Sequence, residues 1–599
     1  MAIIYWITLL ILFFTMLLLK KNDKKKNILC GIVFMSCIIL FYDVFIAYML
    51  THLNIKNTLL IYSLIYLLTS AVLIGINYYK ENKITYQKYY LDKKQLIGFI
   101  IIIIVSFALG ASKYNKFTEI DYLITDAAIH YRMADYYSII QKIFNVAIND
   151  GVRVFNKPMF GYLVPCGLFM EIMPCAKYIS YNLFNTSMIC LIALTAYILC
   201  LEMKTEKKGD VLAPFLVLMY LLAYPLNYMI YGFGYLGCGI LATTLIIYTW
   251  KLIIKEERKS LYIILTLFNI GLFFSYYLFV PVIFLAEGLF IIYRYMEREY
   301  SLKKLFKLGI VTLLIPTVMG YMYFLFKGSI NDTISNTTNS LVIEGSAYKN
   351  LWGNFILLLP MIIYSVVLEI KNKKIDFDIF FLIIELIYLV ITLYFTTKAR
   401  ISTYYFYKPY FILWLICYTY IFKLVNYKNY KTNLIINYSI IVLMIILAIT
   451  ETGQKIFQTN VNFNSHALGP ELANVYRANY TAFNPIDIVD NETAKLILKS
   501  TKYYDKCEIK GRKKTIPYTG NFYQKLWYYG LTSNSPTITY NKNNLNEVFT
   551  KQFDYAEFLK DEKVKCAVVT NRYLEKNKID ISMHKVLYKN KAGSIIKKK

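Results

Sequence analysis

The chain has 599 residues, of which 57% are hydrophobic and only 17% charged, and its mean hydropathy is +0.44. Soluble domains carry about 25% charged residues, so this composition excludes a series of ordinary soluble domains for most of the chain. The formal net charge of +28 would indicate nucleic-acid binding only if the positive residues gathered on one soluble surface.

Long apolar runs recur from residue 2 to about residue 450 and predict an α-helical polytopic membrane protein with about 14 transmembrane helices, because one span needs about 20 apolar residues. The run 261–295 is divided into two spans, because one helix of that length would measure about 52 Å and the hydrocarbon core only about 30 Å. The predicted spans are 2–19, 28–50, 57–78, 96–112, 178–201, 211–229, 234–254, 261–275, 277–295, 304–326, 351–369, 376–396, 405–424 and 433–450.

The charges between the spans predict the orientation. With the N-terminus outside, the inner loops carry 28 Lys and Arg, and the short outer loops carry five. Because Lys and Arg are enriched in cytoplasmic loops, most of the positive charge reflects membrane topology, and we expect no nucleic-acid partner. The inner loops are 20–27, 79–95, 202–210, 251–260, 294–307, 370–375 and 423–432.

Two longer segments lie outside in this topology. Residues 113–177 form an outer loop of the transmembrane domain, which covers 1–450, and residues 451–599 form an extracytoplasmic soluble α/β domain. Within that domain 563–570 alternates like a strand, and 490–499 is typical of a helix with an acidic cap. Heavy use of Ile, Lys, Asn and Tyr suggests an AT-rich, bacterial genome, so we expect a multi-pass protein of the bacterial plasma membrane.

The start of the outer loop 113–177 concentrates acidic side chains. Glu119, Asp121 and Asp126 lie within eight residues, directly after the fourth span. A helix starting at Asp126 places His130 on the same face, four residues later. A carboxylate held at the membrane surface can act as a general base towards an acceptor hydroxyl, with His130 orienting it, sharing the proton transfer, or only packing. The alternative is a solvated loop whose acids complement the helix dipole.

The loop also contains a short apolar stretch, 158–174, which Pro165 interrupts. It is too short for a span and predicts a re-entrant or interfacial helix.

Cations near the outer surface are few. Lys398 and Arg400 open the loop before the thirteenth span, and Lys408 lies just inside that span. Arg and Lys are the side chains that hold phosphate, although Lys408 could equally extend its amine to the interface from an apolar position.

Together these features resemble the GT-C class of integral membrane glycosyltransferases, which includes the protein O-mannosyltransferases and the aminoarabinose transferases. The phrase Asp126-Ala-Ala-Ile-His-Tyr131 is similar to the loop pattern of such proteins. The resemblance implies a polyprenyl-phosphate sugar donor and a glycan, lipid or protein acceptor outside the cytoplasm. It also implies that an acid of the loop is the catalytic base.

By this resemblance Asp126 is the first candidate for the base and Asp121 and Glu119 follow. Lys398, Arg400 and Lys408 would then hold the donor phosphate. This chain departs from the family in one respect. Three spans precede the span that leads into the outer loop, whereas the simplest family members have one span.

Two other classes of function remain open. A transporter or flippase of envelope lipids or glycans would use Glu287 and Glu385, which lie at membrane depth; both acids are also compatible with hydrogen bonds to neighbouring helices. A non-enzymatic envelope assembly or binding protein would use residues 451–599 to recognise a partner.

We expect no cofactor. A divalent ion on Glu119, Asp121 and Asp126 is possible but not favoured. Gly232, Gly234 and Gly237 have dinucleotide-like spacing but follow no strand, which favours close helix packing. Cys507 and Cys566 lie in the outer domain and are compatible with a disulfide.

Overall fold

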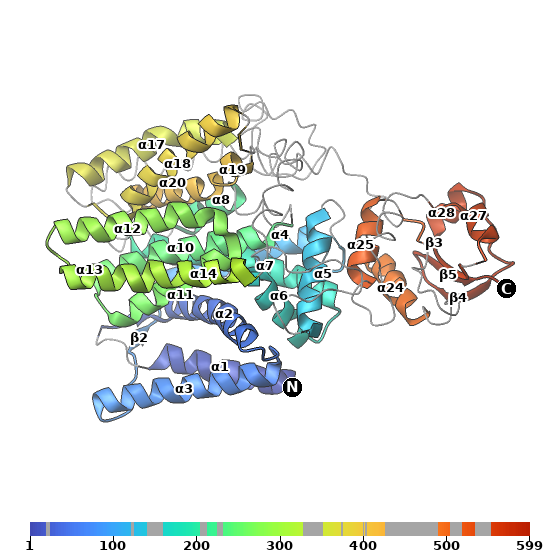
Figure 1. Ribbon diagram of the computed structural model, residues 1–599, viewed down its shortest axis with the longest axis horizontal. Helices are drawn as coiled ribbons and strands as arrows, with labels where there is room; N and C mark the ends of the chain where they lie inside the picture. The colour runs from blue at the N-terminus through green and yellow to red at the C-terminus, as the bar shows by residue number, and fades with distance from the viewer. Residues whose placement is uncertain are drawn as a thin grey trace.

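The structure is a computed structural model in which the helices before residue 426 form one bundle and the elements after residue 488 lie beyond one of its ends (Figure 1). The residues that it describes are 1–19, 24–114, 116–120, 125–140, 160–203, 213–223, 232–326, 351–372, 375–398, 400–401, 404–425, 489–503, 518–520, 522–532, 553–562 and 564–599.

Helices occupy the positions of the predicted spans, apart from 433–450, which lies outside the described residues. Within the described part of the chain, eight helical segments are long and apolar enough to cross a membrane. The bundle contains α1 (Ala2–Leu18), α2 (Ile28–His52), α3 (Leu59–Glu81), α4 (Lys93–Lys113), α5 (Thr125–Ile140), α6 (Phe160–Ile172), α7 (Lys177–Glu202), α8 (Ala213–Ala223), α10 (Gly234–Lys255), α11 (Lys259–Tyr276), η2 (Tyr277–Phe279), α12 (Val280–Met296), α13 (Leu302–Leu308), η3 (Gly309–Leu314), α14 (Ile315–Phe326), α17 (Leu351–Lys371), α18 (Phe377–Thr397), α19 (Tyr404–Tyr407) and α20 (Tyr410–Val425).

The chain reverses direction between α11 and α12, as the length argument predicted. Tyr276 leaves the helical conformation, with φ −150° and ψ 82°. The hydroxyls of Tyr262, near the start of α11, and Tyr300, just after α12, are 3.3 Å apart. One straight helix would separate these two hydroxyls by its whole length, so the division of this run into two helices is confirmed.

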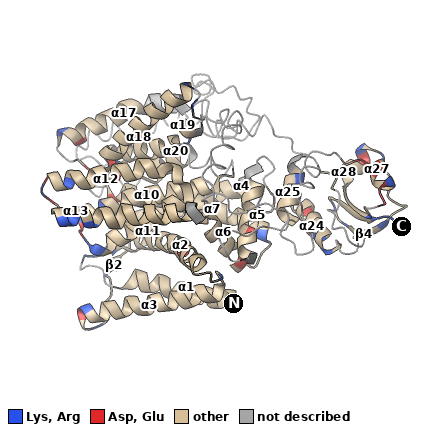
Figure 2. Cartoon of the chain, in the orientation of Figure 1, with Lys and Arg blue, Asp and Glu red and all other residues tan. Residues whose placement is uncertain are grey.

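The predicted inner loops meet at one end of the bundle. Lys26 Nζ lies 3.2 Å from a carboxylate oxygen of Glu256, and Lys255 Nζ lies 2.7 Å from one of Glu202. These four residues come from three different inner loops. Lys and Arg residues are also frequent at the ends of α3, α12 and α13, at the left of Figure 2. The loops that the charge pattern assigned to one side of the membrane therefore share one end of the molecule.

A buried ionic network ties four helices together near this end. Lys251 Nζ of α10 lies 2.5 Å from Asp378 Oδ2 and 2.8 Å from Asp376 Oδ2. Lys423 Nζ of α20 lies 2.8 Å from the same Asp378 oxygen and also pairs with Glu369 of α17. Asp378, in the first turn of α18, is fully buried between the two lysines. The network places each charge against an opposite one, as a low-dielectric interior requires.

The opposite end of the bundle carries the two predicted outer segments. Ile120 N donates to Val489 O at 2.8 Å, and the Tyr178 hydroxyl donates to Asn491. The elements beyond residue 488 are α24 (Asn491–Ser500), η5 (Thr501–Tyr503), α25 (Phe522–Thr532), α27 (Tyr555–Lys560), β3 (Cys566–Thr570), α28 (Asn571–Lys576), β4 (Lys585–Lys589) and β5 (Gly593–Lys597).

The strands form an antiparallel sheet in the order β3-β5-β4, so β5 is central and β4 is an edge strand. The predicted strand at 563–570 and the predicted helix at 490–499 are confirmed by β3 and α24. The Asp490 side chain caps α24 by accepting from Thr493 N at 2.7 Å.

Helix α6 corresponds to the short apolar stretch of the outer loop. It continues through Pro165, and 11 of its 13 residues are buried. Its neighbours are α2, α5, α7, α10 and α11. Because α6 is enclosed by protein, the interfacial alternative, which would keep one face towards lipid, is wrong, and the re-entrant alternative stays a prediction.

Replacing Asp378 by asparagine should destabilise the bundle. The substitution removes the anion that Lys251 and Lys423 share and leaves Lys251 with Asp376 alone and Lys423 with Glu369 alone, which costs up to about 3 kcal/mol. Thermal unfolding of the purified protein in detergent should show a clearly lower midpoint. The matched control Glu297→Gln, an exposed acid, should leave the midpoint unchanged. An Asp378→Asn midpoint equal to wild type would contradict a stabilising network.

Candidate functional site

Helix α5 begins at Thr125, one residue before the predicted start, and places Asp126 in its first turn. Its small residues allow close packing: a Cβ on Gly530 of α25 would lie 3.1 Å from Ala128 O. The ring of Tyr131 lies 5.7 Å from that of Trp527 of α25, measured between centroids. The start of the outer loop is therefore covered by a helix from the C-terminal part of the chain.

The segment Gly232–Tyr235, here called the glycine segment, packs on the first turn of α5. Gly232 has φ +68°, and a Cβ there would lie 2.7 Å from the Cβ of Ala127. A Cβ on Gly234 would overlap the ring of Tyr162 in α6. Both glycines thus serve close packing, and the prediction of packing in place of a dinucleotide site is confirmed.

His130 is fixed by the same segment. Its Nδ1 lies 2.9 Å from Gly232 O, and its ring stands edge-on to Tyr235 with centroids 4.9 Å apart. A carbonyl oxygen only accepts hydrogen bonds, so Nδ1 carries the proton and donates it. Nε2 is then the ring nitrogen that can accept a proton.

Lys408 reaches the glycine segment from the other side. It lies in the turn between α19 and α20, is fully buried, and its Nζ is 3.7 Å from the centre of the Phe233 ring. The rings of Phe233 and Tyr235 are 6.0 Å apart. Lys408 is thus enclosed, and the explanation that its amine reaches out to the interface is wrong. Helix α5, which carries the predicted base, and Lys408, one of the predicted phosphate ligands, therefore both contact the glycine segment.

The other predicted site residues are placed differently. Lys398 and Arg400 lie exposed at the end of α18, so they do not share the buried environment of Lys408. Glu119 is half-buried, and its backbone carbonyl accepts from the Asn182 side chain at 2.8 Å. Asp121 and the side chain of Asp126 lie outside what the structure describes.

Two further residues of α5 make contacts that the sequence pattern did not reveal. Asp135 Oδ1 lies 2.5 Å from Lys177 Nζ of α7. The guanidinium of Arg132 stacks over Tyr529 of α25, 4.3 Å from the ring centre. Their spacing of three residues puts Arg132 and Asp135 on neighbouring parts of one helix face. Nothing in the local sequence indicates partners that are so distant along the chain.

Three acids lie near the middle of long apolar helices: Asp43 of α2, Glu287 of α12 and Glu385 of α18. Two of them have hydrogen-bond donors. Glu287 accepts from Trp250 Nε1 at 2.8 Å and from Asn269 Nδ2 at 2.7 Å, and Asp43 accepts from the Tyr66 hydroxyl at 2.5 Å. Glu385 is fully buried, and neither of its carboxylate oxygens has a hydrogen-bond partner within the described part of the chain. Glu287 therefore has a structural explanation.

Among the described residues, no group of three or more His, Cys, Asp and Glu side chains is arranged to hold a metal ion. Cys566 is disulfide-bonded, and Cys507 lies outside the described residues. Comparison with known protein families and with curated proteins finds no match to this chain.

The glycine segment gives a direct test of this packing. Gly232→Ala places a side chain at a positive φ, which costs about 1–2 kcal/mol, and pushes its Cβ against Ala127. We expect a lower thermal midpoint in detergent. Gly75→Ala is the matched control, because nothing lies within 4 Å of its Cβ position; inside a helix it should stabilise by about 0.5–1 kcal/mol. Equal effects of the two substitutions would rule out a packing role for Gly232.

Proposed function

We propose that this protein is a GT-C-like glycosyltransferase of the bacterial plasma membrane. It would have about fourteen spans in residues 1–450 and an extracytoplasmic α/β domain in residues 451–599. It would transfer a sugar from a polyprenyl-phosphate donor to an extracytoplasmic glycan, lipid or protein. The observation that supports this proposal best is that α5, which carries Asp126, and the buried Lys408 pack on the same glycine segment.

The position of this segment agrees with an extracytoplasmic reaction. The Lys-rich loops meet at the opposite end of the bundle, where Lys26 pairs with Glu256 and Lys255 with Glu202. Since such loops face the cytoplasm, the end with the glycine segment faces outward. A lipid-linked donor in the outer leaflet would reach this end.

In the proposed reaction the Asp126 carboxylate accepts the proton of the acceptor hydroxyl. The acceptor oxygen bonds to the anomeric carbon of the sugar, and the bond from that carbon to the phosphate oxygen breaks, with inversion. The polyprenyl phosphate leaves with the bonding electron pair, and the ammonium of Lys408 balances its negative charge. His130 donates its Nδ1 proton to the Gly232 carbonyl, so its Nε2 can accept a proton and would share the proton transfer. The exposed Lys398 and Arg400 would contribute less to donor binding.

Glu385 supports a second candidate, a transporter or flippase. A buried carboxylate without a hydrogen-bond donor among the described residues is the kind of group on which proton-coupled transport depends. Glu287 does not strengthen this candidate, because its carboxylate already accepts hydrogen bonds from Trp250 and Asn269. A non-enzymatic assembly protein is the third class, in which the contact between α5 and α25 would be purely structural.

Sugar transfer by the purified full-length protein with a polyprenyl-phosphate sugar tests the assignment. Asp126→Asn should lower the rate by 10²–10⁴-fold, the usual contribution of a general base. Lys408→Met should raise the KM for the donor, and Lys398→Met, its exposed counterpart, should have little effect. A wild-type rate for Asp126→Asn would overturn the site. No transfer by the wild type, together with donor movement across vesicles that Glu385→Gln abolishes, would favour the flippase.

The disulfide of Cys566 tests the location of the C-terminal part. Disulfides persist in oxidising compartments outside the cytoplasm. Thiol labelling of the denatured protein should modify the eight free cysteines before reduction and all ten afterwards. In the Cys507→Ser variant, nine cysteines should be labelled both before and after reduction if Cys507 pairs with Cys566. Ten labelled cysteines in the unreduced wild type would argue against an extracytoplasmic C-terminal part.

A further inference from the structure

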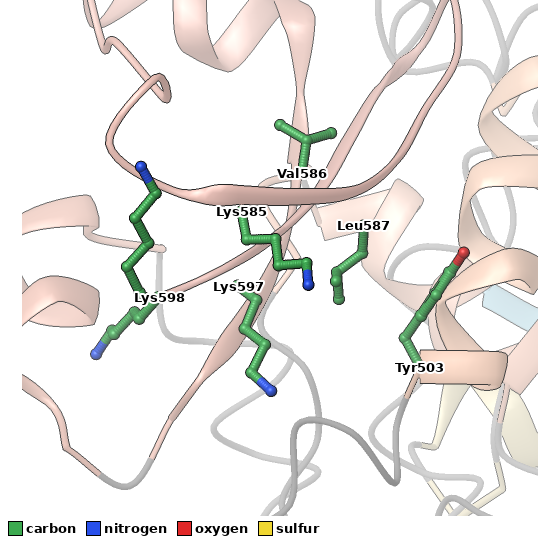
Figure 3. A pocket seen from close by; sticks show the side chains of 7 residues that line it. Tyr503, Lys585, Val586, Leu587, Lys597 and Lys598 are labelled. Carbon is green, nitrogen blue, oxygen red and sulfur yellow. The ribbon is translucent and has the colours of Figure 1, made fainter.

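A hollow of about 440 Å³ lies beside the edge strand β4 and is lined mainly by lysines. Figure 3 shows Lys585 and Lys597 projecting on one side of the sheet, with Leu587 and the ring of Tyr503 beyond them. Lys599, at the end of the chain, also lines it. Its size falls within the range of small-molecule pockets, roughly 300–1,000 Å³.

The two central lysines lie on the same face of the sheet. Lys585 of β4 and Lys597 of β5 are directly opposite in the antiparallel register. Directly opposite residues point to the same face of a sheet, and like charges in such a pair repel one another. An anion bound between the two ammonium groups would be attracted by both.

The surroundings of the hollow add positive charge. The pKa of His584 lies below its ordinary value because of burial and then because of the charges of Lys598 and Lys599. Lys499 of α24 lies over the ring of Tyr588, with its Nζ 5.4 Å from the ring centre. Cations from α24, β4 and the chain terminus therefore face this part of the sheet.

We propose that this hollow binds the phosphate group of a small phosphorylated organic molecule, or of one unit of a phosphate-bearing chain. The ammonium groups of Lys585 and Lys597 would bracket the phosphate as two point charges. The hollow is larger than one phosphate group requires, and Leu587 and the Tyr503 ring offer an apolar wall for the organic part, such as a sugar ring.

The position of the sheet favours a ligand from solution over a membrane lipid. In Figure 1 the strands β3, β4 and β5 lie at the end of the molecule away from the helical bundle. Lipid headgroups surround the helices that cross the membrane, whereas this sheet lies beyond α24 and α25. The site is also separate from the glycine segment, so phosphate binding here and sugar transfer there can succeed or fail independently.

Binding of glucose 1-phosphate to the full-length protein, in nanodiscs of neutral lipid and at low salt, tests the proposal by calorimetry. We expect saturable binding that weakens at higher salt. The double variant Lys585→Ala/Lys597→Ala should weaken it at least tenfold. The charge-matched control Lys560→Ala/Lys576→Ala removes two exposed lysines of the same region, outside the hollow, and should bind like wild type.

A second readout distinguishes a binding site from a damaged fold. Because neither Lys585 nor Lys597 is buried, the ligand-free double variant should keep a thermal midpoint close to that of wild type. Tyr503→Ala should weaken glucose 1-phosphate more than inorganic phosphate. The proposal is overturned if the wild type shows no saturable binding or if both double variants lose affinity equally. Binding only to nanodiscs that contain phosphatidylglycerol would likewise overturn it.

Discussion

The cost of an unpaired charge in hydrocarbon is the constraint on which this structure depends. Within residues 1–450 most lysines lie in the predicted inner loops, and at one end of the bundle acids of neighbouring loops pair with Lys26 and Lys255. This constraint also explains the charges that enter the bundle: Asp378 lies between Lys251 and Lys423, and Glu287 accepts two hydrogen bonds. The same cost accounts for the gathering of loop charges at one end and for the partners of these buried ions.

With the charged loops at one end, the opposite end carries the proposed site. There the glycine segment lets α5 and α6 approach main chain closely, because a side chain at Gly232 or Gly234 would strike Ala127 or Tyr162. In the same segment the Gly232 carbonyl accepts a hydrogen bond from His130, and the Phe233 ring contacts the Lys408 ammonium. The turn that carries Lys408 and the start of α5 are far apart in the sequence. Both pack on the glycine segment, where the absence of side chains at Gly232 and Gly234 allows close approach.

The features that follow local rules were predictable from the sequence. Apolar runs located the helices, the length limit required the reversal near Tyr276, and alternation located the strand that ends at Thr570. The site was predictable only in part. The helix that carries Asp126 and His130 has a local signature. In contrast, the buried position of Lys408 depends on its contact with Phe233, and the position of Arg132 depends on its contact with Tyr529. Such contacts join distant segments, so no periodicity reveals them, and the enclosure of α6 likewise depends on its neighbours.

The central claim is that a polyprenyl phosphate binds where α5, the glycine segment and Lys408 meet. Photolabelling of the purified protein with a photoreactive polyprenyl-phosphate analogue, followed by mass spectrometric mapping, tests it most directly. The account predicts labelled peptides from Gly232–Tyr235 and from Tyr404–Tyr410, with competition by the unlabelled lipid and loss of labelling in Lys408→Met. Competed labelling confined to the opposite end of the bundle, around Lys251 and Asp378, would contradict it.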